Sequence, residues 1–360
     1  MSRKIKVAII GCGGIANGKH LRSLIKLDNV ELVAFCDIIV ERAQKAASDY
    51  GTSGAKVYES YNELFKDVSI EVVHVCTPND SHAEISIAAL ESGKHVMCEK
   101  PMAKTAADAR RMLDAAKRTG KKLSIGYNNR FRADSQYLKE VCDAGELGEI
   151  YYAKAHAIRR RAVPTWGVFL DEEKQGGGAL IDIGTHALDL TLWAMNNYEP
   201  KAVLGKAYHK LAQTENAANF FGSWDPKKFT VEDSAFAMIQ MKNGATVVLE
   251  TSWALNILDT KEAKCTLCGT LGGADMEDGL RLNGEKRSRL YTNGIELNNG
   301  GVAFYEGKAE SDAELEARLW IDAVIHDRQP VVLPEQALVV SEILEAVYES
   351  SKTGKAIYFE

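Results

Sequence analysis

The chain has 360 residues, which is too many for one typical hydrophobic core and predicts two domains. An apolar content of 46% is ordinary for a globular protein, and a net charge of −6 argues against nucleic acid and anionic membranes as partners, because both attract basic surfaces. No apolar run approaches the roughly 18 residues of a membrane span, and the first strand-like run follows no secretory signal, so we expect a cytoplasmic protein.

The first part of the chain alternates apolar strand runs with helical patterns. This alternation predicts a parallel sheet covered by helices on both faces, and we assign residues 1–127 to such a doubly wound Rossmann domain. The expected strands are Ile5–Ile10, Glu31–Asp37, Val72–Thr77, His95–Cys98 and Leu123–Tyr127, and the expected helices span about residues 15–27, 39–50, 60–66, 81–92 and 105–119.

A glycine-rich motif, Gly11-Cys12-Gly13-Gly14-Ile15-Ala16, directly follows the first strand and opens a helix. In this G-x-G-x-x-(G/A) pattern the first glycine permits a tight turn, and the second lets backbone approach a pyrophosphate. A small third residue allows close packing of helix and strand, and the helix N-terminus favours the phosphate charge. The pattern predicts a dinucleotide site that includes residues 11–15, whereas the alternative is a purely structural turn.

An acidic residue, Asp37, ends the second strand, where an acid would bind the adenosine ribose hydroxyls. Ile38 follows it, and no arginine lies beside it to accept a 2′-phosphate. We therefore expect the cofactor to be NAD rather than NADP.

Polar residues follow two further strands, at Thr77-Pro78-Asn79 with His82 and at Glu99-Lys100-Pro101. For the first group, a turn that caps the next helix is the alternative to a cofactor contact. In an open parallel sheet, ligands bind beyond the carboxyl ends of the strands. A partly desolvated lysine beside a cationic nicotinamide ring loses its proton more readily. Lys100 is thus placed to accept a proton from a substrate hydroxyl, with a surface lysine that begins a helix as the alternative.

The pattern changes after about residue 128, and we assign residues 128–334 to a second domain and residues 335–360 to a helix and a short strand. Longer strands and the hairpin signal Asn243-Gly244 predict an open, mostly antiparallel sheet of α+β type. The expected strands are Ile150–Ile158, Lys201–Tyr208, Ser234–Met241, Ala245–Trp253, Lys264–Gly269 and Ala356–Phe359, and the expected helices are 179–195, 313–327 and Glu335–Ser350.

The predicted helix 179–195 carries a polar stripe in an apolar context. Asp182, His186 and Asp189 stand at i, i+4 and i+7 and so share one helix face. Because buried polar groups are costly without partners, the stripe favours a site facing a cleft, and the preceding Gly176-Gly177-Gly178 would let a ligand approach the backbone. The alternatives are an aspartate that complements the helix dipole and a satisfied core histidine.

A metal site is not expected. Cys265 and Cys268 form a C-x-x-C pair, but the segment has a strand pattern, in which positions three apart face opposite sides of the sheet. No second pair completes a set of four ligands.

Together these features resemble the Gfo/Idh/MocA oxidoreductases, the family of glucose–fructose oxidoreductase and inositol dehydrogenase. The resemblance covers nearly the whole chain and is most specific in the E-K-P segment and the later D-x-x-x-H. It implies a Rossmann domain and a substrate domain whose open sheet mediates homodimers or homotetramers.

The resemblance also implies roles for single residues. Lys100 matches the family's catalytic lysine, in reach of cofactor and substrate, while Asp182 and His186 match the pair that positions the substrate and transfers a proton. We assign Trp166 to the sugar pocket, because an aromatic face packs against sugar C–H groups, with a core or interface tryptophan as the alternative. The remaining matches are Thr77, Pro78, Asn79, His82, Glu99 and Asn128 along the cofactor cleft and Arg130 at the substrate.

The implied function is hydride transfer between NAD and a secondary hydroxyl of a sugar, glycoside or cyclitol, with the proton moved by Lys100 or His186. An alternative is a glycosidase-like lyase or hydrolase, in which tightly bound NAD oxidises the sugar transiently and elimination follows. A catalytically silent NAD-binding regulator would lack a catalytic residue, whereas Lys100, Asp182 and His186 are all present.

Overall fold

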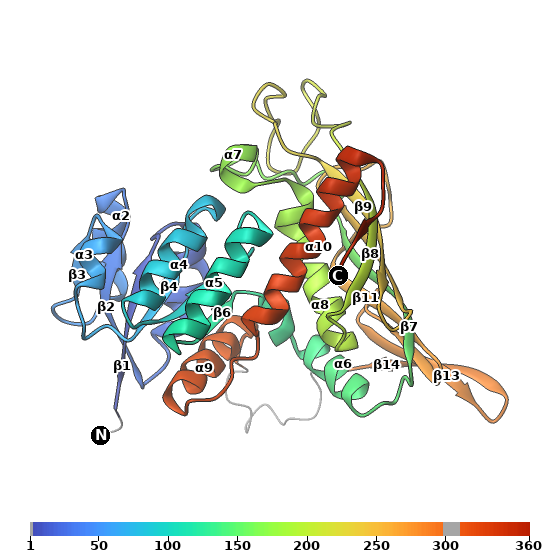
Figure 1. Cartoon of the computed structure of the whole chain (residues 1–360), viewed down its shortest axis with the longest axis horizontal. Coiled ribbons are helices and arrows are strands. Elements are labelled where there is room, and N and C mark those ends of the chain that lie inside the picture. The colour runs from blue at the N-terminus through green and yellow to red at the C-terminus, as the bar shows by residue number, and fades with distance from the viewer. Residues whose placement is uncertain (1–2, 298–309) are drawn as a thin grey trace. The chain divides into compact units, whose positions relative to one another are not determined.

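The computed structural model describes residues 3–297 and 310–360 and divides the chain into two compact units (Figure 1). The first unit comprises Met1–Asn128 and Glu310–Leu338, and the second comprises Asn129–Ala309 and Val339–Glu360. Within the described ranges, no helix combines the length and the apolarity that crossing a bilayer requires.

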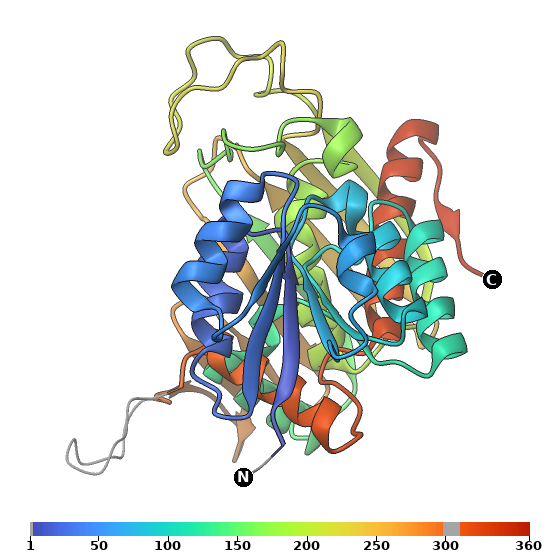
Figure 2. The same ribbon diagram turned by 90° about the vertical axis from the view of Figure 1, so that its left-hand side faces the viewer.

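The first unit is built on a parallel sheet of six strands, counted over the described residues, in the order β3-β2-β1-β4-β5-β6. Helices lie on both faces of this sheet, as Figure 2 shows, so its central strands are apolar on both sides. This arrangement confirms the predicted doubly wound fold. The strands are β1 (Ile5–Ile10), β2 (Val30–Cys36), β3 (Lys56–Tyr58), β4 (Val72–Val75), β5 (His95–Cys98) and β6 (Leu123–Ile125).

The helices of the first unit lie close to the predicted positions. At the start of α5, Thr105 accepts a hydrogen bond from the Asp108 backbone N–H, and Gly120 ends the helix with a φ of 66°. The first helical segment begins as a π-helix, η1. The helices are η1 (Ala16–His20), α1 (Leu21–Leu24), α2 (Val40–Tyr50), α3 (Tyr61–Phe65), η2 (Asn79–Ser81), α4 (His82–Glu91), α5 (Ala106–Thr119) and α9 (Asp312–Ile325).

Helix α9 corrects the predicted domain boundary. We assigned this segment to the second domain, but the structure places residues 310–338 in the first unit. Ala317, Trp320 and Ile321 of α9 are buried in the same apolar cluster as Leu21 and Leu24. The apolar stripe of a helix predicts that the helix is buried, but not which sheet it covers.

The second unit is built on an open sheet of nine strands, counted over the described residues, in the order β14-β13-β12-β11-β7-β10-β9-β8-β15. Only β7 and β10 pair in parallel among them, which confirms a mostly antiparallel sheet. Gly244, with a φ of 93°, turns the chain from β9 to β10 as expected. The strands are β7 (Ile150–Ile158), β8 (Pro200–Tyr208), β9 (Ser234–Met241), β10 (Thr246–Ser252), β11 (Lys261–Gly269), β12 (Gly272–Asp275), β13 (Leu280–Lys286), β14 (Arg289–Ile295) and β15 (Ile357–Tyr358).

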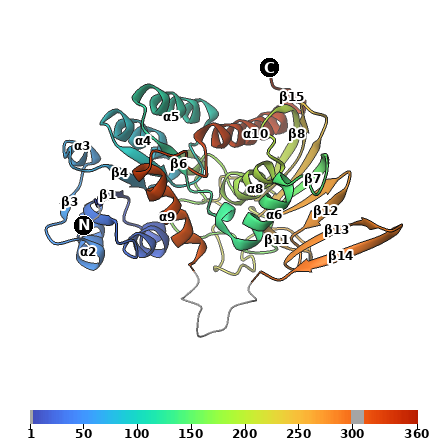
Figure 3. The ribbon, with the colours of Figure 1, turned by 90° about the horizontal axis from the view of Figure 1, so that it is seen from below.

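Helix α8 packs on β7 and β11, and Figure 3 shows α8 and α6 on the same side of this sheet. Nine of the eleven α8 residues are buried. Like η1, the segment that leads into α8 is a π-helix, a rare element that often marks functional positions. The remaining helices are η3 (Asn128–Phe131), α6 (Ala133–Asp143), α7 (Glu172–Gln175), η4 (Leu180–Gly184), α8 (Thr185–Met195) and α10 (Pro334–Thr353).

Candidate functional site

The glycines of the turn after β1 differ in how closely they are packed. Gly11 adopts a φ of 85°, and a Cβ there would lie 2.6 Å from the Cys76 carbonyl oxygen, so this position accepts only glycine. Gly13 and Gly14 have no atom within 4 Å of an added Cβ, so their backbone is open to a ligand. Ala16 is fully buried, which fits the requirement for a small residue between helix and sheet.

Asp37 lies beside this turn at the carboxyl end of β2 and is 7% exposed. Its Oδ2 accepts the Cys12 backbone N–H at 2.8 Å, and its Oδ1 accepts the Ile39 N–H at 2.8 Å. A carboxylate has about four lone-pair sites, so two backbone donors leave acceptor capacity for ribose hydroxyls. The neighbouring Ile38 side chain is 86% exposed, an apolar surface at the rim.

The loops after β4 and β5 are joined through His82. Its Nδ1 lies 2.8 Å from the Pro101 carbonyl oxygen, and its Nε2 lies 2.9 Å from the Thr77 carbonyl oxygen. Burial lowers the pKa of His82, although both carbonyl contacts act in the opposite direction. Thr77 and Asn79 are partly exposed and Pro78 is exposed, so His82 supports a loop whose own surface is accessible.

A buried charged cluster holds Glu99 at the end of β5, and sequence reasoning missed its other members. Glu99 Oε1 accepts hydrogen bonds from Lys19 Nζ at 2.9 Å and from His20 Nε2 at 2.8 Å. Lys19 also pairs with Glu316 of α9 at 2.7 Å, and His20 contacts His74 at 2.9 Å. The sequence hinted at this cluster only through Glu316, an acidic residue that stands within the apolar stripe of a helix.

The cluster determines the ionisation of its members. Burial alone would raise the pKa of Glu99, but the adjacent Lys19 and His20 hold it well below its ordinary value. Burial disfavours the charged form of Lys19, yet Glu316 and Glu99 raise its pKa. Glu99 is thus a fixed anion, and its Oε2 accepts the Lys100 backbone N–H at 3.2 Å.

Lys100 follows Glu99 at this edge of the sheet, and its side chain is partly exposed. Its backbone is anchored on both sides, by Glu99 through its own N–H and by His82 through the carbonyl oxygen of Pro101. The peptide bond between Lys100 and Pro101 is cis. Two buried side chains therefore position the main chain of the candidate proton acceptor.

The structure brings the predicted cofactor residues of the first unit to one sheet edge. Gly11 N donates to Cys36 O at 2.8 Å, Cys76 N to Ile10 O at 2.7 Å and Glu99 N to Val75 O at 2.9 Å, so the strand ends are hydrogen-bonded neighbours. Asn128 follows β6 at the same edge and is partly exposed. An open glycine backbone, an acid with free acceptor capacity and a helix start are groups that fit NAD.

In the second unit, Asp182 lies in η4 and His186 in the first turn of α8. Both side chains are partly exposed, whereas Ile181, Ile183 and Ala187 are buried. Asp182 Oδ2 accepts a hydrogen bond from Trp253 Nε1 at 3.0 Å, and Trp253 is fully buried. A core side chain thus orients the carboxylate, which is itself accessible.

The glycine run before this helix does not admit a ligand, which corrects the interpretation from sequence. A Cβ on Gly177 would lie 1.9 Å from the Tyr348 hydroxyl, and one on Gly178 would lie 2.0 Å from the Glu232 carbonyl oxygen. The Glu232 carboxylate accepts the backbone N–H groups of Gly178 and Leu180, each at 2.8 Å. The chain's own side chains therefore occupy the space that the glycines leave.

Glu232 is expected to give the protein a pH-dependent stability. Burial raises the pKa of Glu232 to about 7, although its backbone hydrogen bonds favour the ionised form. The folded state therefore keeps a proton that the unfolded chain loses above about pH 4.5. This proton contributes up to about 3 kcal/mol to the free energy of unfolding. The contribution is complete below that pH and is lost as the pH rises through 7.

This pH dependence is measured as the melting temperature between pH 5 and 8. The melting temperature of wild type should fall more steeply with rising pH than that of Glu232→Gln, which does not titrate. Glu173→Gln on exposed α7 is the control and should follow wild type. Parallel curves for wild type and Glu232→Gln would show that Glu232 is ionised throughout.

The functional interpretation of Arg130 and Asp189 from sequence is also corrected. Arg130 is 0% exposed, and its Nε and Nη2 donate to the two Asp189 oxygens at 2.9 and 2.6 Å. The guanidinium lies 5.5 Å from the centroid of the Trp193 ring. This bidentate pair is part of the core, so Arg130 is not presented to a substrate and Asp189 does not face a cleft.

Trp166 lies in the loop after β7 and is 52% exposed. It is therefore not a core residue, and its ring packs edge-to-face with Phe221 at 4.7 Å and Phe169 at 5.7 Å. Its position in the second unit is compatible with the predicted contact to a sugar.

The described residues contain no group of three or more His, Cys, Asp or Glu side chains that could hold a metal ion. Cys265 lies buried in β11, where it contacts Met276 Sδ at 3.7 Å, and burial raises its pKa.

The first unit is a Rossmann domain with a dinucleotide-binding edge, and the second is an open-sheet domain with an accessible carboxylate and histidine on one helix. Family models match both parts: "Oxidoreductase family, NAD-binding Rossmann fold" over residues 5–127 and "GFO/IDH/MocA C-terminal domain" over residues 135–275. The chain belongs to the Gfo/Idh/MocA oxidoreductase family, and its first domain is NAD-binding.

Individual relatives agree with this assignment. The chain is 38% identical over 360 residues to D-glucoside 3-dehydrogenase of Escherichia coli K12, covering 99% of this chain and 98% of that protein. It is 30% identical over 275 residues to inositol 2-dehydrogenase of Salmonella paratyphi B, covering 76% and 74%. A crystal structure of an oxidoreductase domain protein from Kribbella flavida has the same fold, with a TM-score of 0.85, 24% identity and full coverage of both chains.

Proposed function

We propose that the protein oxidises a secondary hydroxyl of a sugar, glycoside or cyclitol, with NAD as the hydride acceptor. The observation that carries this proposal is the 38% identity to D-glucoside 3-dehydrogenase over 99% of the chain. The inositol 2-dehydrogenase relative keeps cyclitols in the substrate class. NAD is preferred to NADP because Asp37 would repel a 2′-phosphate and the exposed Ile38 offers it no positive charge.

When bound, NAD accepts the hydride from the carbinol carbon, so the residues of the chain have to hold the alcohol and remove its hydroxyl proton. We assign that proton to Lys100 or His186. The anchored backbone of Lys100 supports the first assignment. The partial exposure of His186 one helical turn after the oriented Asp182 supports the second. Groups that the fold already holds in position lose less entropy when the proton is transferred.

The experiment is an NADH-formation screen at 340 nm with D-glucosides, aldoses and inositols, each with NAD and with NADP. We expect NADH from at least one glucoside or cyclitol and a lower rate with NADP. Arms without added cofactor test the glycosidase-like alternative: sugar release without NADH in those arms would replace dehydrogenation by transient oxidation and elimination. No reaction of either kind with any of the compounds would contradict the proposal.

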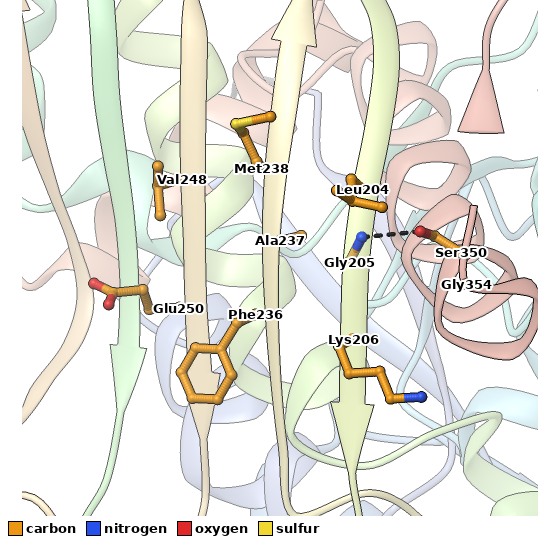
Figure 4. A pocket seen from close by; sticks show the side chains of 10 residues that line it. All are labelled: Leu204, Gly205, Lys206, Phe236, Ala237, Met238, Val248, Glu250, Ser350 and Gly354. Carbon is orange, nitrogen blue, oxygen red and sulfur yellow. Dashed lines mark hydrogen bonds between the residues drawn. The ribbon is translucent and has the colours of Figure 1, made fainter. Parts of the chain in front are cut away.

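We also propose that the protein forms homo-oligomers through the exposed face of the sheet of the second unit. Leu204, Met238 and Val248 stand opposite one another on β8, β9 and β10 and line a shallow hollow with Phe236 (Figure 4). Leu204 is 47% exposed and Met238 is 51% exposed. A contiguous apolar row on a sheet is typical of an interaction surface.

Light scattering on a sizing column measures this association. Wild type should have at least twice the single-chain mass of 39.5 kDa. Leu204→Glu combined with Met238→Lys should reduce the mass to that of one chain, because charges on this face are costly to bury. Leu290→Glu, at an exposed position of β14, is the control. A wild-type mass of one chain would contradict the proposal.

A further inference from the structure

Four aromatic side chains gather on two loops of the second unit, and we call them the loop aromatic cluster: Trp166, Phe169, Phe220 and Phe221. The ring centroids of Phe220 and Phe221 are 4.9 Å apart, those of Phe221 and Trp166 are 4.7 Å apart, and those of Trp166 and Phe169 are 5.7 Å apart. All three contacts are edge-to-face, the arrangement that aromatic pairs prefer. The cluster is therefore one continuous aromatic surface.

The two loops are held together by hydrogen bonds of side chains and backbone. The Asn219 side chain accepts the Val163 N–H at 2.8 Å and donates to the Val163 carbonyl oxygen at 2.9 Å. Phe220 N donates to Arg161 O at 3.1 Å, and Thr165 Oγ1 donates to Phe221 O at 2.6 Å. These contacts flank the aromatic residues directly, so the rings project from a fixed frame.

Three of these rings are accessible. Phe220 is 82% exposed, Trp166 52% and Phe221 39%. Single exposed apolar side chains are normal, but a contiguous group of large aromatic rings is typical of a binding surface, because covering it removes apolar area from water. The connection between β8 and β9 that carries Phe220 and Phe221 is long, and loops of that length are often functional.

The cluster is continuous with the residue that orients Asp182. Phe169 contacts Trp253 with ring centroids 6.5 Å apart, and Trp253 Nε1 donates to Asp182 Oδ2 at 3.0 Å. A single ring, that of Phe169, thus separates Trp166 from the tryptophan that holds the carboxylate. Ring contacts therefore run without a break from the exposed aromatic surface to the side chain that orients Asp182.

We propose that the loop aromatic cluster binds the apolar aglycone of a glycoside while the sugar is held at Asp182 and His186. The inference rests on the proposed function and narrows its substrate class to glycosides with an aromatic or alkyl aglycone. A free sugar covers at most one ring with its C–H face, whereas a phenyl group packs on several of the exposed rings edge-to-face or offset. The cluster thereby distinguishes a glycoside from the free sugar.

The test compares phenyl β-D-glucoside, methyl β-D-glucoside and glucose as substrates with NAD. The Phe220→Ala/Phe221→Ala double variant should lose about tenfold in kcat/KM for the phenyl glucoside, mostly through KM. Its kcat/KM for the methyl glucoside and glucose should stay close to wild type. Leu290→Ala, which removes an exposed apolar side chain on β14, is the matched control. Equal losses on all three substrates, or no loss, would overturn the inference.

Two further measurements separate this inference from the proposed function and from self-association. The first is calorimetric binding of phenyl β-D-glucoside to wild type and to the double variant. If the double variant binds it more weakly and no sugar gives NADH, the result would support the aglycone site and refute the dehydrogenase activity. Light scattering of both proteins should give the same mass. A lower mass for the double variant would assign the cluster to a contact with a second copy of the chain and overturn the aglycone site.

Discussion

Replacing Lys100 with methionine is expected to reduce turnover about 10³-fold while leaving the affinity for NAD nearly unchanged. The methionine side chain has a similar reach but holds no proton. Glu99 accepts the backbone N–H of Lys100 and His82 contacts the carbonyl oxygen of Pro101, so the variant keeps these two contacts to the main chain. The measurement is steady-state NADH formation with the best substrate of the screen, beside a fluorescence titration with NAD.

Lys117→Met is the matched control, because Lys117 is an exposed lysine of the same unit, on α5. It should show wild-type turnover. Turnover of Lys100→Met within about tenfold of wild type would remove Lys100 from the proton transfer and leave His186 as its carrier. A proportional loss of NAD affinity would instead make Lys100 a cofactor-binding residue.

Replacing Arg130 with methionine is expected to destabilise the second unit by about 3–5 kcal/mol, because it leaves the Asp189 carboxylate charged, buried and without its bidentate partner. Both side chains are almost completely buried, with 0% and 1% exposed. Burial already raises the pKa of Asp189 despite the guanidinium. The melting temperature should fall by roughly 10 °C.

The double variant Arg130→Met/Asp189→Leu is the internal comparison. It removes both charges and should recover much of the loss, since a buried pair replaced by apolar residues is often neutral. Arg118→Met, which breaks an exposed pair with Glu91, should change the melting temperature little. Arg130→Met with a wild-type melting temperature and a raised KM for the sugar would restore Arg130 as a substrate residue.

The local parts of the cofactor edge were predictable from sequence. A turn at Gly11, an acid at Asp37 and polar residues after β4 and β5 each follow directly from a strand, and parallel strands bring their ends to one edge. Strand β3 was not predicted because it is a three-residue edge strand with exposed side chains. Strands β13 and β14 were not predicted because they are mostly exposed and polar. Apolar periodicity detects only elements with a buried face.

The pairing of distant side chains was not predictable. Asp189 and Arg130 each had a functional interpretation on its own, and only the structure shows that each is the other's partner. In the same way, Glu316 holds Lys19 from a helix that the sequence pattern assigned to the other domain. The glycine run at residues 176–178 was interpreted as space for a ligand, but Glu232 and Tyr348 fill it.

Corrected in this way, the polar helix of the second unit keeps two candidate residues rather than three. Asp182 is accessible and is oriented by a buried tryptophan, and His186 is accessible one turn later. The buried Asp189 has a structural role. The distinction depends on burial and partners, which the spacing i, i+4 and i+7 does not contain.

The most direct test of the proposed activity follows the hydride itself. A glucoside that carries deuterium on every ring carbon is incubated with unlabelled NAD, and the reduced cofactor is analysed by mass spectrometry. Hydride transfer from a carbinol carbon predicts one deuterium in each NADH formed and a keto sugar in equal amount. Glucoside cleavage or no reaction, without deuterium in the cofactor, would contradict it.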